Sequence, residues 1–291
     1  MTTALSTCSS RRFVIEPAAG EIASIGQVAM YYQALGNGRP LVVIHGSLMT
    51  VGLLGDYPSL LAADRRVIAV ELQGHGHTAD VGRPLRYETL ADDIAALLDH
   101  LGLARADLFG YSLGAGVALQ VAIRHPGRVG RLVAMSGSYR SDGLHPEMAA
   151  IVNYDEMLAQ LAGSPYHRAY EAVAPEPGHW PELVRKVLEL DARPQRWPAE
   201  HISGIESPVM LIVADNDIVR LEHAVEMYHL LGGGIAGDIH GLPASRLAVV
   251  PGTTHAGLCD RAQWVAPMIA EFLDAGCEDG SSVADERSEG R

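Results

Sequence analysis

A serine flanked by glycines is the feature of this sequence that most directly suggests chemistry. The segment Gly110-Tyr111-Ser112-Leu113-Gly114 fits the pattern G-x-S-x-G, and it lies between a predicted strand and an apolar segment of helical spacing. In that context the serine occupies a tight turn that projects its hydroxyl at the start of a helix, and the glycines prevent steric clashes. The pattern predicts that Ser112 is a nucleophile, and the alternative is an ordinary serine that caps a helix.

One histidine is placed to serve as the general base that a serine hydroxyl needs at neutral pH. His255 lies just after the last predicted strand, in a glycine-containing loop that would bring it over Ser112. The alternative is a surface histidine, because the chain has 13 histidines. This position at a strand end is absent for five others that we considered, namely His179, His201, His223, His229 and His240. We therefore predict that His255 is the base.

Two carboxylates compete to be the acid that orients this imidazole. Both lie in Ala214-Asp215-Asn216-Asp217, directly after the fifth predicted strand. In the common pattern a small residue ends the strand and the acid follows three positions later, which selects Asp217. Asp215 is the alternative choice, and it would otherwise be a turn-forming residue. The acid would hold the imidazole tautomer and stabilise the imidazolium.

Backbone N–H groups are expected to stabilise the oxyanion of the reaction, which is usually the largest single contribution to catalysis. One donor should be the N–H of Leu113, directly after the nucleophile. The other should come from the loop His45-Gly46-Ser47-Leu48, which follows the first long predicted strand. We assign the N–H of Ser47 as this second donor and keep the N–H of Leu48 as the alternative. The simpler interpretation is that the loop is only a strand-to-loop turn without a catalytic role.

A second pair of histidines, in Gln73-Gly74-His75-Gly76-His77, could suggest a metal site. No third ligand is in view, and a tight turn with structural histidines is the favoured interpretation. The three cysteines, Cys8, Cys259 and Cys277, match no metal-ligand spacing and are interpreted as free thiols. We therefore expect neither a metal nor an organic cofactor.

Short apolar runs alternate with helical patterns, which indicates an α/β fold with a mostly parallel sheet covered on both faces. Residues 27–35 alternate in polarity and suggest an antiparallel hairpin at the sheet edge. The predicted strands are Leu41–Ile44, Val67–Val70, Asp107–Gly110, Leu132–Met135, Val209–Val213 and Leu247–Val250. The predicted helices are Thr89–Leu101, with Thr89 as N-cap, Val117–Ile123 and Val265–Phe272.

Residues 138–204 break this alternation with many prolines and no convincing strand, so we interpret them as a helical cap inserted into the core, which comprises 21–137 and 205–274. The end segments 1–20 and 275–291 are expected to be disordered, the first partly. The cap could supply an apolar pocket for an aromatic ester or a large lactone. The predicted pocket residues are Leu48, Tyr154, Met157, Tyr166, Trp180 and Trp197, with Met148 and Tyr170 as further candidates. Simple packing within the cap is the alternative explanation for its aromatic residues.

Composition sets limits on partners and location. The chain has 291 residues and a formal net charge of −13, which disfavours binding to nucleic acid or anionic membranes. No apolar stretch is long enough to span a bilayer, and the first residues do not resemble a secretory signal, so a cytoplasmic location is expected. The expected partner is a small-molecule ester or lactone, and the sequence leaves open whether chains form a homo-oligomer.

These residues together resemble the α/β-hydrolase superfamily, in the branch of esterases, lactonases and cofactor-free haloperoxidases. The matching pieces are His45-Gly46-Ser47, the segment 71–76, Gly110 to Gly116, His125-Pro126, Asp217 and His255. The resemblance implies an α/β-hydrolase fold, with a mostly parallel central sheet flanked by helices and an inserted helical cap. Epoxide hydrolases, haloalkane dehalogenases and dienelactone hydrolases carry another nucleophile where this chain has Ser112.

We therefore predict a serine hydrolase that cleaves a carboxylic ester or lactone through an acyl-enzyme. Bacterial lactonases that open the macrolactone zearalenone share the general plan, so a large hydrophobic lactone is one substrate that the resemblance suggests. Perhydrolysis with halide oxidation and hydrolysis of a C–C bond are alternatives that use the same residues. A small-molecule binding protein derived from a hydrolase is the third, because the fold alone does not fix function.

Overall fold

The computed structural model describes residues 20–150 and 153–275. The end segments predicted to be disordered lie almost entirely outside these residues, as do Cys8 and Cys277. Cys259 is a free thiol, as expected. No helix within the described ranges combines the length and hydropathy needed to cross a bilayer.

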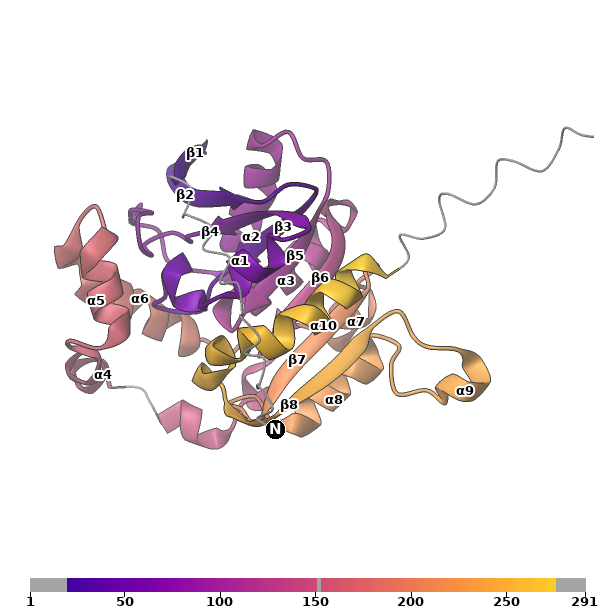
Figure 1. Cartoon of the computed structure of the whole chain (residues 1–291). Coiled ribbons are helices and arrows are strands. Elements are labelled where there is room, and N and C mark those ends of the chain that lie inside the picture. The colour runs from indigo at the N-terminus through magenta and orange to yellow at the C-terminus, as the bar shows by residue number, and fades with distance from the viewer. Residues whose placement is uncertain (1–19, 151–152, 276–291) are drawn as a thin grey trace, which may run out of the picture.

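An eight-stranded sheet forms the centre of the molecule, and its strands are ordered β1-β2-β4-β3-β5-β6-β7-β8 (Figure 1). The first two strands form an antiparallel hairpin at one edge, and β3 to β8 are parallel to one another. This confirms the predicted hairpin and the mostly parallel sheet. The strands are β1 (Glu21–Ile25), β2 (Val28–Leu35), β3 (Arg39–Ile44), β4 (Arg65–Val70), β5 (Ala106–Tyr111), β6 (Val129–Met135), β7 (Val209–Asn216) and β8 (Arg246–Thr254).

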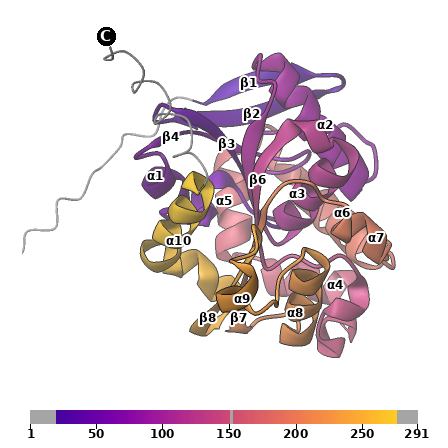
Figure 2. The ribbon, with the colours of Figure 1, turned by 90° about the vertical axis from the view of Figure 1, so that its right-hand side faces the viewer.

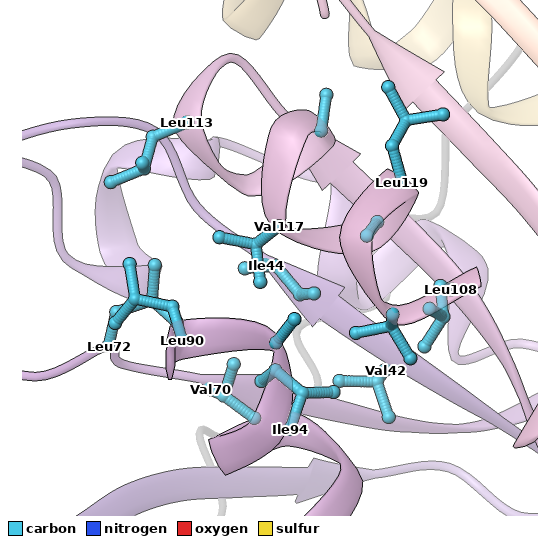
Figure 3. Packing of buried hydrophobic residues seen from close by; sticks show 14 of the residues in the cluster. Val42, Ile44, Val70, Leu72, Leu90, Ile94, Leu108, Leu113, Val117 and Leu119 are labelled. Atoms are coloured by element: carbon cyan, nitrogen blue, oxygen red, sulfur yellow. The ribbon is translucent and has the colours of Figure 1, made fainter. Parts of the chain in front are cut away.

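Alternate residues of the parallel strands pack on opposite faces of the sheet, as the pleat requires. Val42 and Ile44 belong to the cluster formed with the apolar sides of α2 and α3 (Figure 3), whereas Leu41 and Val43 pack with α1 and α10 on the other face. Both faces are therefore covered, which explains why these strands are continuously apolar instead of alternating.

Helices lie on both sides of the sheet, with α1 and α10 on one side and α2 and α3 on the other (Figure 2). The core helices are α1 (Tyr57–Leu61), α2 (Tyr87–His100), α3 (Leu113–Arg124), α8 (Leu221–Leu230), α9 (Gly237–His240) and α10 (Ala262–Asp274). Short 3-10 helices are η1 (Val51–Leu54), η2 (Pro126–Arg128), η3 (Ser141–Gly143), η4 (Pro146–Ala150), η5 (Pro177–His179) and η6 (Ala256–Arg261). Thr89 was wrongly predicted as the N-cap of α2. Arg86 occupies that position, and the Thr89 hydroxyl donates to the Arg86 carbonyl inside the first turn.

Between β6 and β7 the described residues form helices α4 (Tyr154–Leu161), α5 (Pro165–Val173), α6 (Trp180–Asp191) and α7 (Ala199–Ser203). The first three lie together at one side of the molecule, at the left of Figure 1, and α6 packs against both α4 and α5. In contrast, α7 packs against α3 and α8, and Ile202 within it is fully buried. The last helix of the predicted cap therefore contacts helices of the core.

Candidate active site

The turn between β5 and α3 holds Ser112 in a conformation that non-glycine residues rarely adopt, with φ 54° and ψ −115°. A Cβ at Gly110 would approach the Gly114 carbonyl oxygen to 2.1 Å, and a Cβ at Gly114 would approach the Ile44 carbonyl oxygen to 2.2 Å. Both glycines are therefore sterically required. The turn projects the serine hydroxyl at the amino end of α3, as the motif predicts.

A continuous chain of hydrogen bonds links the serine to a buried carboxylate. His255 Nε2 lies 3.0 Å from Ser112 Oγ, and His255 Nδ1 lies 2.8 Å from Asp217 Oδ1. The imidazole is 18% exposed and the carboxylate is 0% exposed. The structure thus brings together the three residues that the sequence proposes as nucleophile, base and acid, although they come from three different strand ends.

The Asp217 carboxylate accepts hydrogen bonds at both of its oxygens. Oδ2 accepts from the Ser136 hydroxyl and from the Ala214 N–H (2.9 Å), while Oδ1 accepts from His255 and from the Val219 N–H (3.3 Å). Burial alone would raise the pKa of Asp217, but the hydrogen bonds and charge of His255, with those from Ser136 and Ala214, lower it below its usual value. The carboxylate is therefore held ionised next to the imidazole.

Asp215, the alternative acid, has a different task. Its side chain is exposed and accepts hydrogen bonds from the N–H groups of Gly252 (2.8 Å) and Thr253 (3.1 Å), where the pairing of β7 with β8 shifts register. These two bonds lower the pKa of Asp215 and fix the path of the chain just before His255. The geometry therefore favours Asp217 over Asp215 as the partner of the imidazole.

Tyr111 makes further contacts with His255. The Tyr111 hydroxyl donates to the His255 carbonyl oxygen at 3.0 Å, and the two rings lie 5.1 Å apart. Tyr111 also comes directly before Ser112, so one side chain connects the serine turn to the histidine loop. Sequence reasoning identified Tyr111 only as a variable position of the motif.

The two backbone groups proposed for the oxyanion are available. Among the described residues, neither the N–H of Ser47 nor that of Leu113 donates a hydrogen bond to the protein, and both residues line the cavity that contains Ser112. Leu48, the alternative donor, has φ 62° and does not line this cavity. Its side chain instead packs against the core cluster that includes α2 and α3.

The histidines near the oxyanion loop are structural in their contacts. His45 and His75 are fully buried, and burial lowers their pKa values to about 3 and about 4. His45 Nε2 accepts from the Leu72 N–H, and His77 pairs with Glu71 at 2.8 Å. Within the described part of the chain, no group of three potential ligands could hold a metal ion. These contacts support the tight turn that the sequence favoured at 73–77.

A cavity of about 720 Å³ opens above Ser112 and lies between the core and the inserted helices. Of the predicted pocket residues, Met157 and Tyr166 line it, and so does Met148. Leu48, Tyr154, Trp180 and Trp197 do not line it, so the structure does not support that assignment for them. Trp180 instead packs within the inserted region, which was the alternative explanation. Its ring is buried and lies against the rings of His167 and Tyr170.

The other two side chains outside the lining are also held by neighbours. The Tyr154 hydroxyl donates to the Pro181 carbonyl oxygen (3.2 Å), and the Trp197 ring meets the Tyr87 ring edge-on. Sequence reasoning in turn missed several lining residues, namely Tyr87, Ser136, Asp191, Arg193 and Arg220. Of these, only Ser136 carried a usable signal, because it directly follows a predicted strand.

Comparison with known proteins identifies the family of this chain. A family model described as alpha/beta hydrolase fold matches residues 39–175. A 2-hydroxy-6-oxo-2,4-heptadienoate hydrolase from Pseudomonas putida is 32% identical over 224 residues, which are 72% of this chain and 78% of that protein. The chain belongs to the alpha/beta hydrolase family.

Other proteins similar to this alpha/beta hydrolase have several different activities. A pimeloyl-[acyl-carrier protein] methyl ester esterase from Neisseria meningitidis is 28% identical over 82% of this chain and 94% of that protein. The enol-lactonase structure from Burkholderia xenovorans LB400 shares the fold, with a TM-score of 0.65, 19% identity, and coverage of 87% of this chain and 99% of that one. Two other curated relatives match over shorter regions, and the chain spans only 29% and 46% of their lengths.

Proposed function

We propose that this hydrolase cleaves a carboxylic ester or lactone through an acyl-enzyme formed on Ser112. The observation that carries the proposal is the chain of hydrogen bonds from Ser112 through His255 to Asp217, placed at the floor of a large cavity. A strained serine next to an imidazole that contacts a buried carboxylate is the arrangement that activates a hydroxyl as a nucleophile.

The geometry supports a two-step acyl transfer. Ser112 Oγ attacks the carbonyl carbon while its proton moves to His255 Nε2, and Asp217 stabilises the resulting imidazolium. The N–H groups of Ser47 and Leu113 hold the oxyanion. His255 then protonates the departing alkoxide, and a water molecule that gives its proton to His255 releases the carboxylic acid and restores the serine.

The cavity supports a substrate larger than a short-chain ester. Its volume of about 720 Å³ is within the range of sites for drug-sized molecules, and Met148, Met157 and Tyr166 give it apolar walls. A macrolactone such as zearalenone therefore belongs in the substrate panel together with aromatic esters and small lactones.

Labelling and hydrolysis together test the proposal. The wild-type protein should react with a fluorophosphonate probe and hydrolyse at least one ester or lactone of the panel. Ser112→Ala should lose the labelling and reduce kcat by at least about 10⁴. A Ser112→Ala variant that keeps most of the hydrolysis would refute the nucleophile. A folded wild-type protein that neither labels nor hydrolyses any compound would favour a binding protein.

Hydrolysis of a C–C bond is the second candidate, and the heptadienoate hydrolase with 32% identity favours it. A vinylogous diketone would have to reach the same serine and histidine. Assaying p-nitrophenyl esters and lactones beside such a diketone separates the two, because a true C–C hydrolase should turn over the diketone with the higher kcat/KM. Peroxide-dependent halogenation in the same panel would indicate a perhydrolase.

A further inference from the structure

The side chain of Tyr111 contacts three loops of the proposed catalytic centre. Tyr111 is the last residue of β5, directly before Ser112, and it is 4% exposed. Its hydroxyl donates to the His255 carbonyl oxygen at 3.0 Å. A Cβ on Gly46 would come within 3.1 Å of the Tyr111 ring, so the ring also packs on the loop that supplies the Ser47 N–H. One side chain therefore joins the nucleophile turn, the loop of the base and the loop proposed to bind the oxyanion.

The hydroxyl of Tyr111 adds to the His255 backbone a contact that the local helix does not need. The His255 carbonyl oxygen accepts from this hydroxyl and also from the Leu258 N–H at 3.3 Å. The second bond closes the turn that leads into η6, and it remains when the hydroxyl is removed. The carbonyl would therefore keep a partner without Tyr111. What the hydroxyl contributes is a link from the backbone of the base to the end of β5.

The ring of Tyr111 limits how the imidazole can tilt. The two ring centroids lie 5.1 Å apart, and the ring planes meet at 32°. The hydrogen bond from Nδ1 to Asp217 fixes one corner of the imidazole, but a ring held at one corner can still swing about it. The neighbouring phenol ring occupies part of the space that this movement needs. It therefore helps to keep Nε2 directed at Ser112 Oγ, 3.0 Å away.

The donor hydrogen of Tyr111 is used inside the protein and not on the substrate. Burial raises the pKa of Tyr111, so the phenol stays protonated and remains a donor. Tyr111 lines the cavity, but its hydroxyl hydrogen is directed at the His255 carbonyl oxygen. A phenol has one hydrogen to donate. The hydroxyl is therefore expected to act through the base, and its loss should leave substrate binding nearly unchanged.

We propose that Tyr111 is a positioning residue for the base, whose hydroxyl holds the His255 backbone and whose ring holds the imidazole. Because Tyr111 and Ser112 are consecutive, the bond couples the nucleophile turn to the histidine loop, and the reacting atoms keep their separation. Such coupling matters because a misplacement of about 1 Å can reduce a rate by about 10²-fold. The inference rests on the proposed function for the reaction that this base serves.

Removal of the hydroxyl alone tests this role. Tyr111→Phe keeps the ring, so the fold should be preserved, and circular dichroism checks it. We expect kcat to fall by about tenfold with KM unchanged, which corresponds to the upper end of the net contribution of one hydrogen bond. The rate constant for labelling by a fluorophosphonate probe should fall by a similar factor, because that reaction also requires His255 to take the proton of Ser112.

Tyr57→Phe is the matched control. Tyr57 is fully buried, and its hydroxyl donates at 3.0 Å to the Leu258 carbonyl oxygen in the same segment, whereas its ring lies against Phe109. This variant should keep kcat and the labelling rate within about twofold, because no contact of the imidazole is lost. Equal losses in the two variants would overturn the positioning role, and so would a Tyr111→Phe variant that changes only KM or keeps wild-type kcat and labelling.

Proton NMR distinguishes failure of this inference from failure of the proposed function. If wild type neither labels nor hydrolyses any compound, the proposed function fails, and the signal of the His255 Nδ1 proton that bonds Asp217 still reports the position of the imidazole. That signal is assigned by its loss in His255→Gln. Tyr111→Phe should shift or broaden it, and Tyr57→Phe should leave it unchanged. In an inactive protein, a signal that is the same in wild type and Tyr111→Phe would overturn the positioning role.

Discussion

Replacing Asp217 by asparagine tests the hydrogen-bonded chain at its most buried end. Oδ2 accepts from the Ala214 N–H at 2.9 Å and from the Ser136 hydroxyl, whereas Oδ1 accepts from His255 at 2.8 Å and from the Val219 N–H at 3.3 Å. Asparagine offers only one acceptor oxygen. The shorter of the two backbone contacts, from Ala214, favours placing that oxygen at the Oδ2 position, so the amide nitrogen faces the imidazole.

This arrangement stabilises the tautomer of His255 that cannot accept a proton from Ser112. With an amide N–H directed at Nδ1, the imidazole keeps its proton on Nε2, and Nε2 can no longer accept the proton of Ser112. We expect kcat to fall by about 10⁴, equivalent to about 5.5 kcal/mol of transition-state stabilisation, with little change in KM because the cavity wall is untouched. The side chain keeps its shape, so the fold should be preserved.

The assay is steady-state hydrolysis of whichever ester or lactone wild type turns over best, with circular dichroism to verify folding. Asp215→Asn is the matched control, because its side chain is exposed: the amide oxygen can accept from one of Gly252 and Thr253, and water can accept from the other N–H. This control should keep kcat within about threefold, since no bond to the imidazole is lost. A folded Asp217→Asn variant with more than about a hundredth of the wild-type kcat would refute the assigned acid, and so would an equal loss in both variants.

Two further outcomes are expected. Ser136→Ala removes one hydrogen-bond donor to the Asp217 carboxylate. We expect kcat to fall by about tenfold and the acid limb of the pH–rate profile to move to higher pH. An unchanged profile would contradict this positioning role of Ser136. Because burial depresses the pKa values of His45 and His75 from 6.5 to about 3 and about 4, stability is lost as pH falls below 6.5. Urea unfolding should show a loss of about 2 kcal/mol per histidine between pH 7 and pH 5, and a flat dependence contradicts it.

The parallel core and the three aligned side chains could be predicted because their determinants are local. A strand buried on both faces must be continuously apolar, and a serine in a strained turn requires glycines at Gly110 and Gly114. His255 and Asp217 were found from their positions after strands, since parallel strands present their carboxyl ends at one edge of the sheet. The spacing after the strand already selected Asp217 over Asp215, and the structure places Asp217 Oδ1 2.8 Å from His255 Nδ1.

The cavity wall could not be predicted in the same way, because lining a cavity depends on tertiary placement. Trp180 and Met157 are both apolar residues of the inserted region, yet only Met157 faces the cavity, since the Trp180 ring fills the space between α5 and α6. Sequence reasoning also made no prediction for Arg193, whose Nη1 is buried without a hydrogen-bond partner among the described residues. Sequence patterns record which residues are apolar, but they do not record which enclosed polar residues lack a partner.

Backbone strain connects the site to the fold that supports it. Within the described residues, the non-glycine positions with positive φ are Leu48, Ser112 and Ser136. They lie in the loop proposed to bind the oxyanion, at the proposed nucleophile, and at the residue whose hydroxyl donates to the Asp217 carboxylate. Each such position costs on the order of 1–3 kcal/mol, and the rigid strand ends that precede these residues are what hold them there. The strained backbone conformations are found in three separate loops around the Ser112 hydroxyl. Folding alone does not explain them, because each loop could relax independently. They are explained if the loops are held in place to aim Ser112, its oxyanion donors and its acid at one carbonyl group.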